Sequence, residues 1–303
     1  MTPSQFSADL LAPVFSGLAG FNFMAAGSYK SVYRVAHSDN SPDEVLKVVR
    51  LPNLRDTEEK EAIYQQELGR VQRETEILRK CTSPFVVKMG KIPPHAVTIS
   101  GYPCFAYTEE LLNGSDLCSR ILAIRRGAEK RPVEKEVRCL LHCLVSAIQA
   151  LWRDHRIVHR DIKPANIFAT HDPSRPYVLI DLGIAYDVTV PGLTLRKTDM
   201  PHTPLYMAPE MLSADFRETM SYRSDLYAAA LSAYEFAAGI HPLSKRDDDL
   251  MKTYTRVVQQ EPVPLAQCRP DFSPTLCRLI DQFLKKSPSL RPANMALILN
   301  QIA

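Results

Sequence analysis

Residues 159–166 bring together three side chains that could carry out phosphoryl transfer. The stretch reads His-Arg-Asp-Ile-Lys-Pro-Ala-Asn. Asp161 can accept a proton from an attacking hydroxyl, Lys163 can neutralise a phosphoryl oxygen, and Asn166 offers a carbonyl oxygen to a divalent cation. Such a reaction depends on positioning and charge stabilisation more than on covalent help from the protein. A charged surface turn that ends at a proline is the alternative interpretation, and the rest of the chain argues against it.

A second carboxylate follows at a spacing that suits a metal site. Asp181 lies 15 residues after Asn166, directly behind the strand-like run 177–180, and Leu182 and Gly183 come next. Hard oxygen ligands from one or two side chains, together with phosphates, suit Mg²⁺. An isolated Asp-x-Gly is usually a turn, but its place behind residues 159–166 favours a metal ligand.

These two stretches resemble the catalytic loop and the Asp-Phe-Gly motif of the protein kinase family. Five positions of residues 159–166 agree with the family's His-Arg-Asp-x-x-x-x-Asn pattern and its lysine. The resemblance implies that Asp161, Lys163 and Asn166 are catalytic, and that Asn166 and Asp181 hold the Mg²⁺ that accompanies ATP.

Lys47, within Val45-Leu46-Lys47-Val48, takes the place of the family's strand lysine. The resemblance implies that Lys47 is catalytic: it would hold the α and β phosphates of ATP and pair with an acid on the following helix. The family alignment puts that acid at Glu74, with Glu67 as an alternative on a similar face. A solvent-facing lysine of an alternating strand is the competing interpretation.

The loop that would cover the phosphates departs from the family pattern. Of its three glycines only Gly27 is present, because Ala25 and Lys30 replace the first and third. The resemblance still implies that Ala25, Gly27, Tyr29 and Val32 lie along the nucleotide, with Val32 over adenine. Since glycine permits close approach of the backbone to phosphate, we expect a stiffer loop and looser ATP binding, which the charge of Lys30 could partly offset.

Residues 110–117 resemble the family's hinge. The resemblance implies that Glu110 and Leu112 carry adenine on backbone groups and that Asp116 holds the ribose hydroxyls.

Three further positions complete the expected nucleotide pocket. Glu109, or Thr108 if the register slips by one, would guard the back of the pocket. Val45 would lie above adenine and Phe168 below it, where the family usually has smaller residues, so the slot would be narrower.

Residues 202–210 resemble the family segment that ends in Ala-Pro-Glu, with His202 in place of glycine. The resemblance implies a buried ion pair between Glu210 and Arg291, and it implies that Asp225 anchors the backbone of the catalytic loop.

The acceptor and the activating signal are less constrained. Lys163 and Thr203 favour serine or threonine over tyrosine as the acceptor. Thr194 and Thr198 are candidate phosphorylation sites upstream, and Asp199 is a fixed carboxylate that could pair with Arg160 instead.

Bulk composition adds limits on the protein's class. The chain has 303 residues and a net charge of +3, so neither nucleic acid nor a membrane surface is an expected partner. Its longest apolar stretch, 140–152, is too short to span a bilayer, and the first twenty or so residues do not form a signal peptide. The cysteine count is odd. Zinc at Cys139 and Cys143 would need further ligands, so free thiols in a reducing, cytoplasmic compartment are expected.

The order of predicted elements indicates an α+β, two-lobed protein kinase fold in a single domain over residues 1–303. Its parts are a β-rich N-lobe (about 21–110), a hinge (about 110–115) and a helical C-lobe (about 116–303). Alternating residues predict strands at 21–23, 32–35, 45–49, 86–91, 96–100 and 104–108. Helical periods predict helices at 57–80, 133–154, 224–238, 274–285 and 292–300.

The resulting hypothesis is a protein serine/threonine kinase that uses ATP and Mg²⁺ on hydroxyl groups of a protein substrate. The alternative is a pseudokinase, a nucleotide-binding or scaffold module, which the depleted glycine loop favours and the complete set of Lys47, Asp161, Asn166 and Asp181 opposes.

Overall fold

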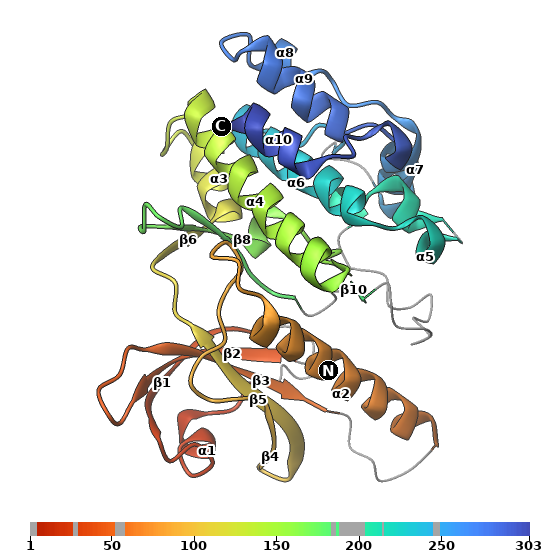
Figure 1. The fold of residues 1–303 in the computed structure, drawn as a ribbon. Helices are drawn as coiled ribbons and strands as arrows, with labels where there is room; N and C mark the ends of the chain where they lie inside the picture. Colours follow the sequence, from red (N-terminus) through yellow and green to blue (C-terminus); the bar gives the residue numbers. More distant parts are fainter. Residues whose placement is uncertain are drawn as a thin grey trace. The chain divides into compact units, whose positions relative to one another are not determined.

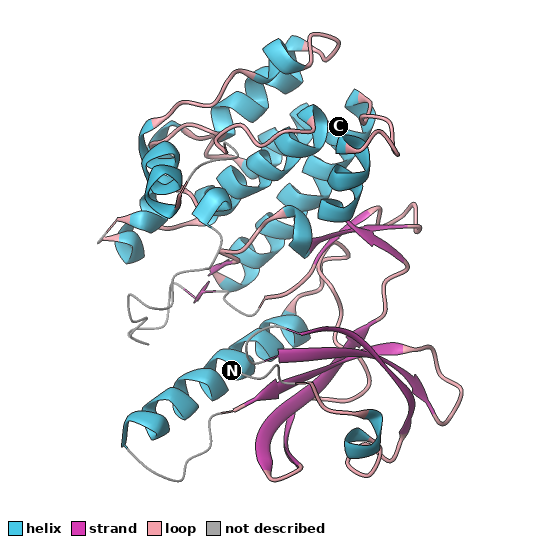
Figure 2. Ribbon diagram, turned by 180° about the vertical axis from the view of Figure 1, so that it is seen from behind, coloured by secondary structure: helices cyan, strands magenta, loops and turns pink. Residues whose placement is uncertain are grey.

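The structure, a computed structural model, describes residues 5–26, 30–51, 58–182, 186–187, 204–213, 215–244 and 249–303. The chain divides into two compact units. The N-terminal unit comprises Met1–Cys81 and Val87–Leu112, and the C-terminal unit comprises Thr82–Val86 and Asn113–Ala303. Figure 2 shows the long strands in the N-terminal unit and most of the helices in the C-terminal unit.

A five-stranded antiparallel sheet, ordered β1-β2-β3-β5-β4, forms the body of the N-terminal unit (Figure 1). Its strands are β1 (Leu18–Ala26), β2 (Lys30–His37), β3 (Glu44–Arg50), β4 (His95–Ile99) and β5 (Tyr102–Glu110). Because successive side chains point to opposite faces, Lys47 lies on one face of β3 while its neighbours Leu46 and Val48 lie on the other.

The face that carries Leu46 and Val48 is covered by residues near the N-terminal end of the described chain. Phe6, Leu11 of helix α1 (Ala8–Leu11) and Phe15 are buried in one cluster with the strand residues of this face. The hydroxyl of Tyr33 ties the segment down, since it accepts the Phe6 N–H at 2.8 Å and donates to the Phe6 carbonyl at 3.0 Å.

Helix α2 (Glu58–Lys80) supplies the acid expected opposite Lys47. Val71, Glu74, Thr75 and Leu78 are all buried, and their spacing of three and four residues places them on one face of the helix. Glu74 is therefore a charged residue on the buried face.

The C-terminal unit is built of helices around α6, which is buried along nearly its whole length from Ser224 to Ala238. Helix α6 begins at an N-cap, Ser221, and ends at Gly239, whose φ of 74° suits glycine at a helix C-terminus. The helices are α3 (Leu117–Arg125), α4 (Glu134–His155), α5 (Phe216–Thr219), α6 (Tyr222–Ala238), α7 (Leu250–Gln259), α8 (Leu265–Cys268), α9 (Pro274–Phe283) and α10 (Met295–Ile302).

Short strands and 3₁₀ turns position the loops of this unit. One three-stranded sheet pairs β6 (Gly114–Asp116), β8 (Ile167–Thr170) and β9 (Tyr177–Leu179), and β7 (Ile157–Val158) pairs with β10 (Tyr186–Asp187). The 3₁₀ turns are η1 (Pro164–Asn166), η3 (Pro204–Tyr206), η4 (Pro209–Leu212) and η5 (Pro288–Leu290).

The expected α+β class is confirmed: an antiparallel sheet precedes a helical region. The strand predicted at 86–91 is wrong. Val86 and Met89 form only isolated bridges, to Leu179 and Glu109. Between them the Lys88 N–H donates to the Glu110 side chain at 2.8 Å instead of to a neighbouring strand, which interrupts the regular ladder.

None of the helices in the described ranges is long and apolar enough to cross a membrane. All seven cysteines lie within these ranges as free thiols.

Candidate active site

The catalytic-loop side chains predicted from the sequence lie together between β7 and β8. The Lys163 ammonium donates to both carboxylate oxygens of Asp161, at 2.9 Å to Oδ1 and 2.8 Å to Oδ2. Asn166 Nδ2 donates to Asp161 Oδ2 and to the Asp161 carbonyl, both at 2.8 Å. The Asp161 carboxylate is thus oriented by one cation and one amide, with 19% of its side chain exposed to solvent.

Helix α6 fixes this loop through a buried carboxylate. Asp225 Oδ2 accepts the backbone N–H of His159 at 2.7 Å, and Oδ1 accepts that of Arg160 at 3.0 Å. Burial raises the pKa of Asp225 to about 7, although the two N–H groups and Arg160 favour its charged form. Burial also lowers the pKa of His159.

Asp181 follows β9 and lies one residue beyond a backbone contact with the catalytic loop. The Ile180 N–H donates to the Asn166 carbonyl at 2.9 Å, which brings the chain at Asp181 alongside Asn166. Since Nδ2 of Asn166 makes two bonds to Asp161, Oδ1 is the Asn166 atom that suits a cation. An amide oxygen and a carboxylate fit the oxygen preference of Mg²⁺.

In the N-terminal unit, Lys47 lies between two buried carboxylates. Its Nζ is 2.5 Å from Glu109 Oε1 and 3.5 Å from Glu74 Oε1. Burial raises the pKa of Glu109, and the charge of Glu74 raises it further, while Lys47 lowers it. Glu67, the alternative partner proposed from the sequence, forms an ion pair with Arg70 at 3.8 Å.

Glu109 is the polar partner of Lys47 that sequence reasoning missed, because it was expected only to guard the back of the pocket. Val45 pairs with Glu109 and Lys47 with Tyr107 between β3 and β5. Lys47 and Glu109 are therefore diagonal neighbours on one face of the sheet, within reach of each other. The sequence did contain one indication of this contact. Glu109 closely follows the apolar run 104–107, and a carboxylate that is buried needs a partner.

Several expected nucleotide residues of the N-terminal unit also lie on β1, β2 and β3. Val32 pairs with both Ala25 and Lys47, so these three positions follow one another across the sheet. Val32 and Val45 are half-buried, and Ala25 is exposed. Gly27 and Tyr29 lie outside the described residues.

The expected hinge residues have structural contacts of their own. Leu112 is half-buried, and Glu110 Oε1 accepts the Lys88 N–H at 2.8 Å. Asp116 pairs with Phe168 across β6 and β8, which places the proposed ribose and adenine residues of the C-terminal unit side by side. Asp116 also caps α3, because its carboxylate accepts the Ser119 N–H at 2.8 Å.

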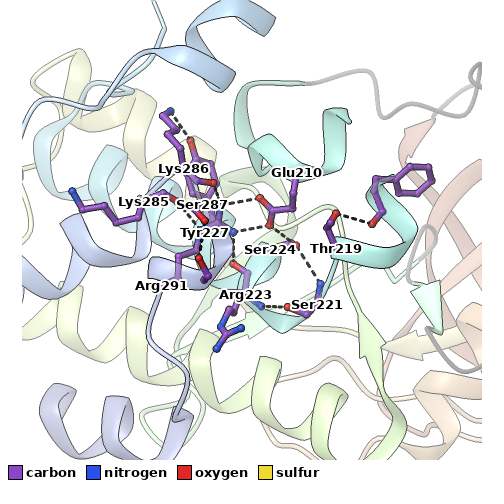
Figure 3. A network of polar contacts seen from close by, with 12 residues as sticks. Glu210, Thr219, Ser221, Arg223, Ser224, Tyr227, Lys285, Lys286, Ser287 and Arg291 are labelled. Atoms are coloured by element: carbon purple, nitrogen blue, oxygen red, sulfur yellow. Dashed lines mark hydrogen bonds and ion pairs between the residues drawn. The ribbon is translucent and has the colours of Figure 1, made fainter. Parts of the chain in front are cut away.

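Glu210 and Arg291 form a bidentate buried ion pair in the C-terminal unit (Figure 3). Arg291 Nη1 lies 2.6 Å from Oε1 and Nη2 lies 2.8 Å from Oε2. Ser224 donates to Glu210 Oε1 at 2.7 Å, and three backbone carbonyls accept from Arg291. The paired charges are thus enclosed in a network of hydrogen bonds, as a buried pair requires.

The predicted regulatory residues Thr194, Thr198, Asp199 and the acceptor-side Thr203 all lie outside the described residues. The chain is described again from residue 204, where Tyr206 donates its hydroxyl proton to Glu235 of α6.

The match of the protein kinase domain family covers residues 22–301. The chain belongs to this family, and the kinase fold expected from the sequence is confirmed. Among curated relatives, the dual specificity mitogen-activated protein kinase kinase mek-1 of Caenorhabditis elegans is 30% identical over 54% of this chain and 44% of its own length. The MAP kinase kinase PBS2 of Saccharomyces cerevisiae is 28% identical over 89% of this chain and 37% of its own. The serine/threonine-protein kinase pkn3 of Myxococcus xanthus is 29% identical over 88% of this chain and 46% of its own.

The chain spans less than half the length of these three relatives. By its name mek-1 is a dual specificity kinase, pkn3 is a serine/threonine-protein kinase, and PBS2 is a MAP kinase kinase.

Proposed function

We propose that this chain is a protein serine/threonine kinase that transfers the γ-phosphoryl group of ATP to a hydroxyl of a protein substrate. The observation that carries the proposal is the arrangement of Asp161, whose carboxylate is oriented by Lys163 and Asn166 within 3 Å. A carboxylate held in this way can orient a hydroxyl and accept its proton as the oxygen bonds to phosphorus.

Each of the other site residues has a distinct role in the proposal. Lys163 stabilises charge on the transferred group, and Lys47 holds the α and β phosphates. Asn166 and Asp181 hold Mg²⁺, which neutralises phosphate charge when bound. Asp161 Oδ2 accepts hydrogen bonds from both Lys163 and Asn166, which fixes the orientation of the carboxylate toward an incoming hydroxyl.

The nucleotide-binding residues and the domain division are part of the same proposal. ATP would contact Ala25, Gly27, Tyr29, Val32, Val45, Glu110, Leu112, Asp116 and Phe168. One kinase domain would extend over 1–303, and the boundary between the two compact units at Leu112 and Asn113 supports a hinge there. The free cysteines support a reducing compartment such as the cytoplasm.

Radiolabelled ATP with Mg²⁺ and a mixture of serine, threonine and tyrosine peptides tests the proposal. Wild type should label serine and threonine peptides, and Asp161→Asn should not. Asp154→Asn is a matched control, because Asp154 is exposed and pairs only with its neighbour Arg153 among the contacts described. Equal labelling by wild type and Asp161→Asn would contradict the assigned role of Asp161.

A pseudokinase that binds nucleotide or acts as a scaffold is the second candidate. The carboxylate of Glu109 at 2.5 Å from Lys47 favours it, since that contact opposes binding of Lys47 to phosphate. Binding of Mg·ATP without transfer to any peptide of the mixture would select this candidate.

A further inference from the structure

The ammonium of Lys47 is shared by two buried carboxylates that come from different elements. The side chains of Lys47, Glu74 and Glu109 are only 7%, 3% and 5% exposed. Two carboxylates and one ammonium carry an excess negative charge, and a buried excess charge is costly.

The two carboxylates are not equivalent partners. Glu109 is held in place by the pairing of β3 with β5. Its carboxylate accepts a hydrogen bond from the Lys47 ammonium at 2.5 Å. Glu74 lies on α2 at 3.5 Å, and its Oε1 has no hydrogen-bond partner among the described residues. Lys47 is therefore bound mainly to the sheet and only weakly to the helix.

The charged groups that face Glu109 come from three elements. They are Lys47 on β3, Glu74 on α2 and Lys30 on β2. Burial and the charge of Glu74 raise the pKa of Glu109, and the two lysines lower it. Removing Lys47 from this set would leave two carboxylates close together in a buried site.

We propose that Glu109 is a positioning residue that competes with nucleotide phosphate for Lys47, so that Lys47 must leave Glu109 in order to hold ATP. The inference rests on the proposed function, because it takes Lys47 to be the phosphate ligand. The ammonium of Lys47 has three protons but a single positive charge. Phosphate and the Glu109 carboxylate compete for that charge, and the 2.5 Å contact with Glu109 holds Lys47 back from phosphate.

Proton uptake follows from this competition. When Lys47 turns to phosphate, the Glu109 carboxylate loses its closest cation and binds a proton from solvent to become a neutral carboxylic acid. The protonated protein then binds nucleotide more tightly than the ionised protein. Affinity for nucleotide therefore falls as the pH rises from the pKa of Glu109 in the free protein to its higher pKa in the complex.

Calorimetric titration with Mg²⁺ and a non-hydrolysable ATP analogue tests the proposal, in two buffers of different ionisation heat between about pH 6 and pH 8.5. Glu109→Gln keeps the shape of the side chain and removes its charge. Glu109→Met is a second uncharged variant of similar length. Glu76→Gln is the control, because Glu76 is 61% exposed and pairs with Lys80 on the same helix as Glu74.

We expect Glu109→Gln and Glu109→Met to bind the analogue about tenfold more tightly than wild type near neutral pH. Wild type and Glu76→Gln should take up the same number of protons when they bind the analogue, and the Glu109 variants should take up fewer. Protons bound or released by the nucleotide itself are the same for every variant and cancel in this comparison. If the Glu109 variants bind the analogue and wild type does not, that result supports the proposal as well.

Two results would overturn it, and they differ in meaning. If wild type binds and the folded Glu109 variants bind equally or more weakly with the same proton uptake, the competition is refuted while the nucleotide site stands. If neither wild type nor any folded variant binds the analogue, the proposed nucleotide site fails and the inference fails with it. Thermal melting identifies which variants are folded.

Discussion

The carboxylate of Asp225 accepts the backbone N–H of Arg160 at 3.0 Å, and Arg160 has a φ of 67°. A left-handed conformation at a non-glycine residue costs roughly 1–2 kcal/mol, so it persists only where surrounding contacts require it. Asp225 also accepts the His159 N–H at 2.7 Å. One buried carboxylate on α6 therefore maintains the turn that presents Asp161.

Asp225→Asn should lower kcat at least about tenfold, because one of the two acceptor oxygens becomes an N–H₂ group that faces a backbone donor. The KM for ATP should change much less, since Asp225 touches the loop backbone and not the proposed nucleotide residues. Steady-state kinetics separate the two effects, and circular dichroism checks the fold. A rise in KM at constant kcat would contradict the positioning role.

Asp181→Asn should remove the stabilisation that Mg·ATP gives to the protein. Asparagine is a better probe than alanine here, because Asp181 has a φ of 63° and asparagine tolerates that region. The free variant should keep its stability within about 1 kcal/mol. Calorimetric melting with and without EDTA measures both quantities. A wild-type-sized shift in melting temperature from Mg·ATP would show that the metal assignment is wrong.

Lys47→Met should abolish transfer and also destabilise the fold at neutral pH by about 3–5 kcal/mol, because it leaves two buried carboxylates without their cation. The pKa of Glu109 is already raised by burial, and loss of Lys47 raises it further. Protonation at lower pH then relieves the repulsion, so the destabilisation should shrink as the pH falls.

Urea unfolding of wild type and Lys47→Met across pH measures that change. The double variant Lys47→Met with Glu109→Gln should recover part of the lost stability at neutral pH. A loss of stability that does not vary with pH would argue that the two carboxylates are not the cause.

Replacing one residue of the buried Glu210–Arg291 pair should lower the free energy of unfolding more than replacing both residues. Arg291→Met should cost about 3–5 kcal/mol, since Glu210 would stay buried without a cation, and Glu210→Gln should cost a similar amount. The double replacement by methionine should cost clearly less than the sum. A double-mutant cycle by denaturant unfolding gives the coupling, and simple additivity would show that the pair is not coupled.

His241 should make the fold less stable in mild acid. Burial lowers its pKa from 6.5 to about 4, so between these values the unfolded chain binds a proton that the folded chain does not. Stability contributed by the neutral imidazole is lost as the pH falls, by up to about 3 kcal/mol. His241→Phe should flatten the stability curve in this range, whereas His171→Phe, at an exposed position, should not.

The helices with a clear apolar period were predicted closely. In α4 the buried residues Val137, Leu140, Leu141 and Leu144 repeat as a single stripe, and the structure begins and ends the helix within a residue of the prediction. Helix α7 was not predicted. Its buried residues Thr253 and Val257 are four positions apart, but the apolar Met251 and Val258 are exposed, so apolar residues lie on both faces of this helix.

The same distinction applies to the site. The contacts of Asp161 with Lys163 and Asn166 arise within one loop, so the local sequence was enough to predict their proximity. The contact between Lys47 and Glu109 joins residues 62 positions apart and depends on the register of β3 against β5. No local pattern specifies that register, which is why the competing carboxylate could be found only in the folded chain.

The residues before residue 22 limit how far the N-terminus of this protein can be shortened. The family match begins at residue 22, but Phe6, Leu11 and Phe15 cover an apolar face of the sheet. The Tyr33 hydroxyl also forms two hydrogen bonds with the Phe6 backbone. A truncated chain that started at the edge of the family match would leave that face open to water. Large exposed apolar patches promote self-association, so expression of such a chain would yield aggregates, and a usable truncation must begin upstream of Phe6.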